Sequence, residues 1–198
     1  MKKMKIYLLG GGGHCISAID VIESTGDYQI EGIFDLKEKV GQEILGYKII
    51  DEDRNVGNYL DEDAYFLITV GQIKSSEVRR RLFYKLASLG AKFATIVSPR
   101  AYVSKFSKVG AGTLVLHDVV INADVTVGLN CIINTKSLLE HSVSVGDHCH
   151  ISTGAVLNGD CRIGRDSFIG SNSVLEQGCI VNDESVLSAG KFHRGSKK

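Results

Sequence analysis

The stretch VGLNCIINTKSLLEHSVSVGDHCHI, residues 127–151, has an aliphatic side chain at every sixth position: Val127, Ile133, Leu139, Val145 and Ile151. The same spacing runs through sixteen aliphatic positions, from Val97 to Leu187. Side chains on one face of a strand recur every two residues, and those of an α-helix about every 3.6, so a period of six indicates a coil that turns a corner every six residues. Three such sides make one coil of eighteen residues. The sequence therefore predicts a parallel β-helix of hexapeptide repeats after residue 97.

A second pattern with the same period concerns side-chain size. Two residues before each aliphatic position after Val97, no side chain is larger than valine. A three-sided coil has narrow corners that admit only small groups. Glycine often follows the aliphatic residue, where we expect it to relax the backbone; these glycines are Gly110, Gly128, Gly146, Gly164 and Gly170.

The residues before this repeat alternate between strand and helix patterns. This alternation predicts a small Rossmann-like α/β domain, and the change of pattern near residue 97 predicts two domains, 1–97 and 98–198. We expect strands over 5–9, 29–34, 65–70 and 92–97 and helices over 15–24 and 75–89.

A run of four glycines and His14 follows the first predicted strand. Glycines let a backbone approach a ligand closely, and the helix that follows offers unpaired N–H groups to a phosphate. Asp35 stands about twenty residues later, at the end of the next strand, where an acid meets a ribose or base in dinucleotide-binding folds. A glycine turn can also simply be tight. Because the spacing departs from the dinucleotide fingerprint and the domain is small, we expect a nucleotide-sugar rather than NAD.

Charge and hydropathy exclude several classes of function. The 23 basic and 23 acidic side chains balance, and no basic stripe interleaved with aromatic residues indicates nucleic-acid binding. The apolar run over residues 6–9 is too short for a signal peptide, and no segment approaches the roughly 20 apolar residues of a membrane span. We expect a soluble cytoplasmic protein.

Four of the five cysteines occupy the small corner positions of the repeat: Cys131, Cys149, Cys161 and Cys179. There a cysteine acts as a small apolar side chain. Pairs one coil apart are close enough for a disulfide, although corner packing explains the pattern better. Cys15 has no obvious partner.

His141 is the candidate catalytic residue. Its neighbours eighteen residues away, Ala123 and Gly159, are small, which predicts open space beside the imidazole for a substrate. A neutral imidazole can act as a general base when an amine or hydroxyl attacks an acyl carbon. Glu140 could orient the ring, but adjacent residues on a strand generally face opposite sides.

The residues GGGGH at 10–14, Asp35, Ile133-Asn134-Thr135, Leu139-Glu140-His141 and the hexapeptides together resemble the bacterial sialic acid O-acetyltransferase family, which includes nucleotide-activated amino-sugar N-acetyltransferases. The resemblance covers almost the whole chain. It implies that the N-terminal domain holds a nucleotide-sugar, that the β-helix is left-handed and forms a homotrimer, and that acetyl-coenzyme A lies between neighbouring β-helices.

The resemblance also implies roles for single residues. His141 matches the general base, with Glu140 beside it as a second catalytic candidate. Gly11, Gly13, His14 and Asp35 match nucleotide-sugar contacts, and Asn134 belongs to the family's Asn-Thr motif as a substrate-binding residue. His150 matches a second histidine that lines the acetyl site. We assign His150, Gly159 and Lys191 to the coenzyme site, and we expect no metal.

Three features depart from the family pattern. Ser142 stands where an acid usually follows the catalytic histidine, and Lys136 stands where a small residue is common. The C-terminal tail, residues 188–198, differs from the family's usual ending, although Lys191 and Arg194 could still meet coenzyme phosphates.

We therefore expect an acetyl-CoA-dependent N-acetyltransferase that acts on a nucleotide-linked amino-sugar used in bacterial surface glycans. Alternatives are O-acetylation of a sialic-acid-like sugar and a catalytically inactive β-helix scaffold. A zinc-dependent hydratase would need histidines at metal-ligand spacing. The repeat supplies the number of histidines but no recognisable spacing: His117, His141, His148 and His150.

Overall fold

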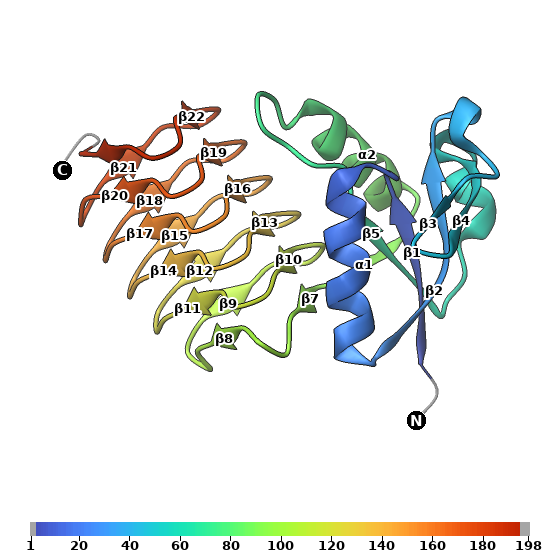
Figure 1. Ribbon diagram of the computed structural model, residues 1–198, viewed down its shortest axis with the longest axis horizontal. Coiled ribbons are helices and arrows are strands. Elements are labelled where there is room, and N and C mark those ends of the chain that lie inside the picture. The colour runs from blue at the N-terminus through green and yellow to red at the C-terminus, as the bar shows by residue number, and fades with distance from the viewer. Residues whose placement is uncertain (1–2, 195–198) are drawn as a thin grey trace. The chain divides into compact units, whose positions relative to one another are not determined.

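The computed structural model describes residues 3–194 and divides into two compact units (Figure 1). The first unit contains the described residues up to Gly71 together with Glu77–Ala94. The second contains Gln72–Ser76 and the described residues from Thr95 onward. The predicted fold class, an α/β unit followed by a left-handed β-helix, is confirmed.

The first unit is built on one six-stranded sheet of order β3-β4-β2-β1-β5-β6. Strand β1 (Met4–Leu9) lies between β2 (Tyr28–Asp35) and β5 (Ala64–Ile68) and is parallel to both. Helix α1 (Gly13–Thr25) connects β1 to β2. The strand after β1, β2, lies on one side of it, and β5 is added later on its other side. The carboxyl end of β1 is therefore a topological switch point, and open α/β sheets bind ligands at such points. The remaining elements are η1 (Lys37–Lys39), β3 (Glu43–Ile44), β4 (Tyr47–Glu52), η2 (Asp53–Tyr59), α2 (Glu77–Ser88) and β6 (Lys92–Phe93).

Two parts of the first unit differ from the sequence prediction. The segment between β2 and β5 contains the hairpin β3–β4, which turns at Leu45 and Gly46 with φ of 48° and 83°. Two successive left-handed residues are typical of a two-residue hairpin turn. The single strand predicted over 92–97 was wrong, because the chain changes sheets there. Ala94 N–H donates to Phe66 of β5, whereas Ile96 N–H donates to Thr113 of the β-helix.

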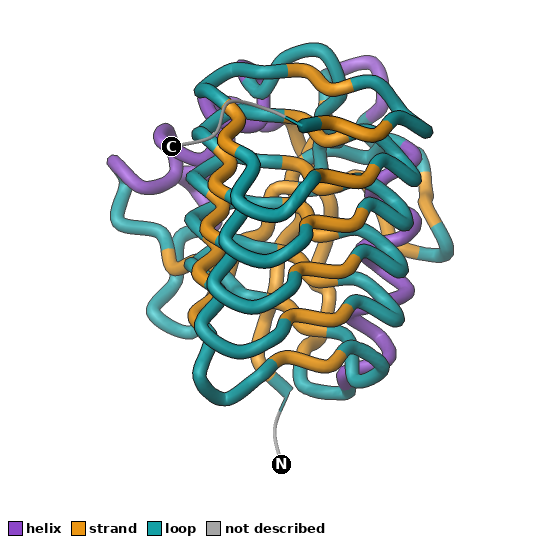
Figure 2. The backbone as a smooth tube through the Cα atoms, turned by 90° about the vertical axis from the view of Figure 1, so that its left-hand side faces the viewer, coloured by secondary structure: helices purple, strands orange, loops and turns teal. Residues whose placement is uncertain are grey.

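The second unit stacks two-residue strands into three parallel sheets (Figure 2). Each strand pairs with the strand eighteen residues later; for example, Leu114 pairs with Ile132. The first face consists of β7 (Ile96–Val97), β10 (Leu114–Val115), β13 (Ile132–Ile133), β16 (His150–Ile151), β19 (Phe168–Ile169) and β22 (Val186–Leu187). The second face consists of β8 (Tyr102–Val103), β11 (Val120–Ile121), β14 (Leu138–Leu139), β17 (Val156–Leu157), β20 (Val174–Leu175) and β23 (Phe192–His193). The third face consists of β9 (Lys108–Val109), β12 (Thr126–Val127), β15 (Ser144–Val145), β18 (Arg162–Ile163) and β21 (Ile180–Val181).

The interior of the β-helix is the aliphatic column that the repeat predicts. All sixteen aliphatic positions from Val97 to Leu187 belong to one core cluster or pack against it. Because neighbouring residues of a strand face opposite sides, the first residue of each two-residue strand points outward. The repeat therefore determines which residues form the core and which residues lie on each outer face.

The corners take their shape from left-handed backbone rather than from the glycines that we predicted to relax it. Positive φ occurs three residues after the aliphatic position, at Asp118, Asp124, Asn130, Lys136, Ser142, His148, Asp160, Asp166, Asn172 and Glu184 and at Gly112, Gly154, Gly178 and Gly190. The glycines directly after the aliphatic position serve close stacking of coils instead. A Cβ built on Gly146 would lie 2.6 Å from the backbone nitrogen of Arg165.

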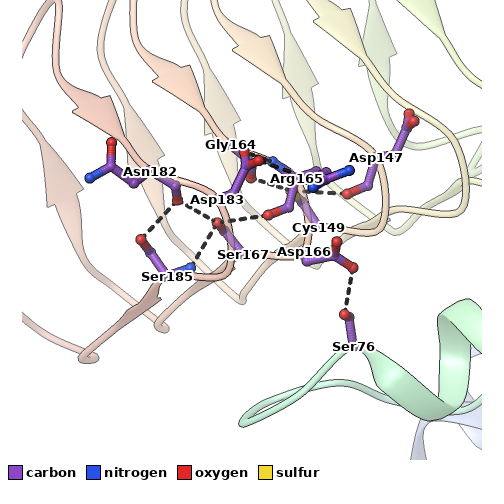
Figure 3. A network of polar contacts seen from close by, with 10 residues as sticks. All are labelled: Ser76, Asp147, Cys149, Gly164, Arg165, Asp166, Ser167, Asn182, Asp183 and Ser185. Atoms are coloured by element: carbon purple, nitrogen blue, oxygen red, sulfur yellow. Dashed lines mark hydrogen bonds and ion pairs between the residues drawn. The ribbon is translucent and has the colours of Figure 1, made fainter.

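The small corner positions also carry hydrogen bonds between coils. The thiols of Cys131 and Cys149 donate to the carbonyls of Gly146 and Gly164, at 3.2 and 3.1 Å. The Ser167 hydroxyl donates in the same way to the carbonyl of Asn182, at 3.1 Å (Figure 3). All five cysteines are buried free thiols. The four cysteines at the corners are thus explained by packing and hydrogen bonding without a disulfide.

Candidate active site

A pocket of about 480 Å³ lies in the first unit, where β1, β2 and β5 end. Its lining includes Gly12, Gly13, His14, Asp35, Lys39 and Arg81. The predicted nucleotide-sugar residues Gly13, His14 and Asp35 are therefore brought together around one pocket. Gly11 is bonded to a residue of this pocket, because its N–H donates to Asp35 Oδ2 at 2.7 Å.

The four glycines of the loop have different reasons to be glycine. Gly10 has a φ of 106°, and a Cβ there would lie 2.4 Å from Val70 Cγ2, so the fold itself requires glycine. A Cβ on Gly11 would lie 2.8 Å from Ile44 Cδ1. Nothing lies within 4 Å of a Cβ built on Gly12 or Gly13. Packing does not require glycine at those two positions, so the space in front of them is free for a ligand.

Asp35 holds the end of β2 and the glycine loop together. Its Oδ2 accepts hydrogen bonds from Gly11 N–H and from Lys39 Nζ at 2.9 Å, and its Oδ1 accepts one from Leu36 N–H at 2.7 Å. Burial alone would raise the pKa of the Asp35 carboxyl. The hydrogen bonds from Lys39, Leu36 and Gly11 outweigh burial, so the pKa of Asp35 lies below its usual value. The side chain is therefore a buried carboxylate that supports the pocket wall.

Two cations that no sequence motif indicated, Lys39 and Arg81, line the same pocket. Lys39 is paired with Asp35. Arg81 is exposed on α2, and within residues 3–194 no carboxylate or other hydrogen-bonding group pairs with its guanidinium. The basic, amphipathic pattern of the predicted helix over 75–89 was the available signal. An unpaired guanidinium beside the open N-terminus of α1 suits an anionic group.

His141 lies in the second unit, at the corner that follows β14. The ring is exposed, and a Cβ on Gly159 would lie 2.5 Å from its Cε1 and 2.6 Å from its Nε2. The room that Gly159 leaves is therefore taken by the imidazole itself. Within the described residues, no side chain forms a hydrogen bond or ion pair with this ring. The imidazole lies against backbone on one side and is accessible on the other.

Glu140 has its partner on the neighbouring coil. Its Oε2 accepts a hydrogen bond from Asn122 Nδ2 at 2.9 Å. In the structure, Glu140 is therefore bound along the stack of coils rather than to the His141 ring.

Asn134 and His150 form a hydrogen-bonded pair. Asn134 Nδ2 and His150 Nε2 are 3.1 Å apart, and Asn134 Oδ1 accepts the N–H of Thr135 at 2.8 Å. His150 is buried, and its ring contacts Phe168 edge-on at a centroid distance of 5.1 Å. The structure thus joins a residue that we assigned to the substrate with one that we assigned to the coenzyme.

The residues that depart from the family pattern lie at corners or in the tail. Ser142 and Lys136 both have left-handed backbone, with φ of 61° and 60°. Lys191 is exposed directly before β23. Arg194 is the last described residue, and the rest of the tail lies outside the described residues.

Residues 3–194 contain neither a candidate metal cluster nor a candidate membrane span. No group of three or more His, Cys, Asp or Glu side chains in this part of the chain is arranged to hold a metal ion. Neither of its α-helices is both long and apolar enough to span a membrane.

Comparison with protein-family models matches two separate parts of the chain. Residues 5–86 match the PglD N-terminal domain, and residues 118–158 and 161–192 match the hexapeptide repeat of succinyl-transferase. The chain has a PglD-like N-terminal domain followed by hexapeptide repeats. The pocket thus belongs to its PglD-like domain, and His141, Asn134 and His150 belong to its hexapeptide domain.

Solved structures match the chain over nearly its whole length. The acetyltransferase domain of PglB from Neisseria gonorrhoeae is 26% identical, with a TM-score of 0.90 over 99% of this chain and 94% of that one. The same domain in complex with acetyl coenzyme A matches at 26% identity and a TM-score of 0.86, over 99% and 96% of the two chains. PerB from Caulobacter crescentus, in complex with CoA and GDP-perosamine, shares the fold at 23% identity and a TM-score of 0.89, over 98% and 90%. The resemblance that the sequence predicted is confirmed.

Proposed function

We propose that this PglD-like protein is an acetyl-CoA-dependent N-acetyltransferase that acts on the amine of a nucleotide-linked amino-sugar. The observation that carries the proposal is the exposed His141 imidazole, which lies against Gly159 and has no partner within the described residues. Such a ring is free to accept a proton. The similarity to an acetyltransferase domain that binds acetyl coenzyme A supports the acyl donor.

In this proposal the chemistry is a direct transfer. The amine nitrogen attacks the thioester carbonyl and forms a C–N bond, while the C–S bond breaks and coenzyme A leaves as thiol. His141 accepts the proton that the amine loses, and the departing thiolate takes up a proton. No carboxylate supports the His141 ring within the described residues. Since an amine is a better nucleophile than a hydroxyl, this arrangement favours amine over hydroxyl acceptors.

The pocket of the PglD-like domain is the proposed site for the nucleotide part of the acceptor. Helix α1 begins there without a side-chain cap and without an acid in its first turn, so its free N–H groups can meet a diphosphate. Arg81 supplies a cation for the same diphosphate. In this assignment Asp35 supports the glycine loop, and Gly12 and Gly13 leave room for the ligand.

We also propose that the hexapeptide domain assembles as a homotrimer through its second face. The outward positions of that face form one apolar column: Tyr102, Val120, Leu138, Val156, Val174 and Phe192. The third face carries Lys108, Thr126, Ser144, Arg162 and Ile180 in the equivalent places, so four of its five outward residues are polar. A continuous apolar stripe on a small protein is typical of an interface. His141 lies two residues after β14 of this face, so such an interface would lie close to the imidazole, where the coenzyme is expected.

The coenzyme residues that we propose are His150, Gly159 and Lys191, and because Asn134 is bonded to His150 we now add it to this group rather than to the substrate residues. Asn134 has a second N–H that its bond to His150 leaves available, and it can donate to the carbonyl of the acetyl group. Lys191 is exposed and suits a phosphate.

An acetyl-transfer assay tests the proposal. The purified protein would be mixed with acetyl-CoA and a panel of UDP-, GDP- and CMP-linked amino-sugars, with matched hydroxyl sugars in parallel, and thiol release would be followed. We expect release with an amino-sugar, a fall of about 10²–10⁴-fold in His141→Ala, and near-normal turnover in the control His117→Ala. No release with any acceptor, or normal turnover in His141→Ala, would contradict the proposal. Release with hydroxyl sugars alone would replace it by O-acetylation.

A further inference from the structure

The segment Gln72–Ser76, which connects β5 to α2, is fastened to corners of the β-helix. Gln72 Nε2 donates to the carbonyl of His148 at 2.8 Å. Ser76 Oγ donates to Asp166 Oδ1 at 2.5 Å, as Figure 3 shows. Both side chains are buried, with 3% and 5% of their surface exposed. The backbone of residue 72 is therefore held in a fixed place beside the coil that carries His150.

The main-chain oxygen of Gln72 sets the tautomer of His150. It lies 2.6 Å from His150 Nδ1, and a carbonyl oxygen can only accept, so Nδ1 carries the hydrogen. In the neutral ring, Nε2 is then an acceptor. The group that faces Nε2 is the Asn134 side-chain amide, which must present its NH₂.

The other end of the Asn134 amide agrees with this polarity. Its Oδ1 accepts the N–H of Thr135, so a flipped amide would place NH₂ against that donor and oxygen against the His150 Nε2 lone pair. The hydrogen bonds therefore run in one direction, from Asn134 to His150 and from His150 to Gln72. The second N–H of the Asn134 amide forms no hydrogen bond within the described residues.

We propose that Gln72 is a positioning residue of the acetyl site. Its main-chain oxygen, anchored by its own side-chain amide, keeps His150 in the Nδ1–H tautomer, and His150 in turn orients Asn134 so that its spare N–H meets the acetyl carbonyl oxygen. The inference rests on the proposed function. It assigns His150 an orienting role rather than proton transfer, because both ring nitrogens are already engaged.

Gln72→Met tests the proposal, because methionine has a similar size and cannot donate to His148. Ser76→Ala is the matched control, since it removes the other anchor of the same segment without touching the coil of His150. The tautomer of His150 would be read from long-range ¹H–¹⁵N correlations of the full-length protein with labelled imidazoles. We expect the Nδ1–H form in the unmodified protein and in Ser76→Ala, and a mixture of tautomers in Gln72→Met.

Kinetics give the second measurement. Loss of one anchoring hydrogen bond is expected to lower kcat in Gln72→Met by about 3- to 10-fold, with little change in KM for the nucleotide-sugar. If Gln72→Met does not fold, Asn134→Asp replaces it, because a carboxylate cannot donate to Nε2 and should draw a proton onto that nitrogen.

Each outcome decides a different point. An Nε2–H tautomer in the unmodified protein overturns the inference, as do an unchanged tautomer and kcat in Gln72→Met. In Asn134→Asp, an Nε2 that stays unprotonated has the same meaning. A protein that shows the Nδ1–H tautomer but transfers no acetyl group refutes the proposed function, and the role of Gln72 with it. Acetyl transfer that is unaffected in Gln72→Met refutes the role of Gln72 alone.

Discussion

Gly159 lies so close to the imidazole of His141 that a methyl group at position 159 would overlap the ring. A Cβ there would be 2.5 Å from Cε1, 2.6 Å from Nε2 and 3.2 Å from Nδ1. The backbone of Gly159 is not left-handed, so glycine is not needed for its conformation. Because residue 159 has no side chain, the His141 imidazole can lie against its backbone.

Gly159→Ala should therefore displace the His141 ring without unfolding the coil. Because a general base acts only within hydrogen-bond reach of the proton, we expect kcat to fall by at least about 10-fold. KM for the nucleotide-sugar should change little, and thermal unfolding should stay within a few degrees of the unmodified protein. Steady-state kinetics and calorimetry provide the measurements. Unchanged kcat in a folded Gly159→Ala protein would show that the ring's place against residue 159 has no part in the reaction.

The glycine loop offers a matched pair of substitutions. Gly10→Ala meets Val70 in a left-handed conformation and should destabilise the first unit by several kcal/mol. Gly13→Ala meets nothing and lies at the start of α1, so it should leave stability equal or raise it by up to about 1 kcal/mol.

Ligand binding should separate these two substitutions further. If the space beside Gly13 receives a nucleotide-sugar, Gly13→Ala should weaken its binding by about 10-fold or more, as measured by titration calorimetry, since a methyl group excludes the ligand's closest approach. Full affinity in Gly13→Ala would move the ligand away from the loop.

Asp35 should make stability depend on pH in a defined direction. The pKa of its carboxyl is lowered in the folded protein, so it stabilises the fold above the unfolded pKa of about 3.9, and this contribution is lost as the pH falls through the lower folded pKa. Asp35→Asn should cost about 2 kcal/mol near neutral pH, and the difference should shrink below about pH 4.

Urea unfolding of Asp35→Asn across this pH range is the measurement. Glu38→Gln, which changes an exposed carboxylate on the neighbouring turn, is the control and should show little difference at any pH. A penalty for Asp35→Asn that stays constant down to about pH 3 would mean that the charge of Asp35 is not what stabilises the loop.

The apolar column of the second face predicts the effect of a charge on assembly. Leu138→Glu places a carboxylate in the middle of that column, so we expect the trimer to dissociate and acetyl transfer to fall with it. Ser144→Glu places the same charge on the polar third face and should change neither. Sedimentation velocity at several concentrations measures assembly. A Leu138→Glu protein that assembles normally would exclude the second face as the interface.

Much of the β-helix could be predicted, because its repeat is a local property of the sequence. The period of six predicts which residues face inward, and all sixteen belong to the core cluster or pack against it. The prediction that glycines directly after the aliphatic positions relax the backbone at the corners was wrong. The Asp, Asn and Gly residues three places after each aliphatic position were the signal for left-handed backbone, since these types tolerate positive φ best, and the repeat also places Lys, Ser, His and Glu there.

The candidate site was less predictable, because its contacts join residues far apart in the chain. The glycine loop and Asp35 follow from local patterns, but the pairing of Asp35 with Lys39 and the position of Arg81 depend on how β2 and α2 pack. Gln72 carried no local signal at all. Its bonds to His148 and His150 cross more than seventy residues, and no periodicity in the sequence records them.

Because its coils stack in the same way throughout, this domain can differ in length without a change in its candidate site. Asn134, His141, His150 and Gly159 all come from two successive turns of the solenoid, and each turn contacts only its neighbours. Whole eighteen-residue turns could be added or removed elsewhere, lengthening or shortening the prism by about 4.8 Å each. Such changes would adjust how much surface two copies share and would leave these four residues where they are, so relatives of different length can keep the same arrangement of the candidate site.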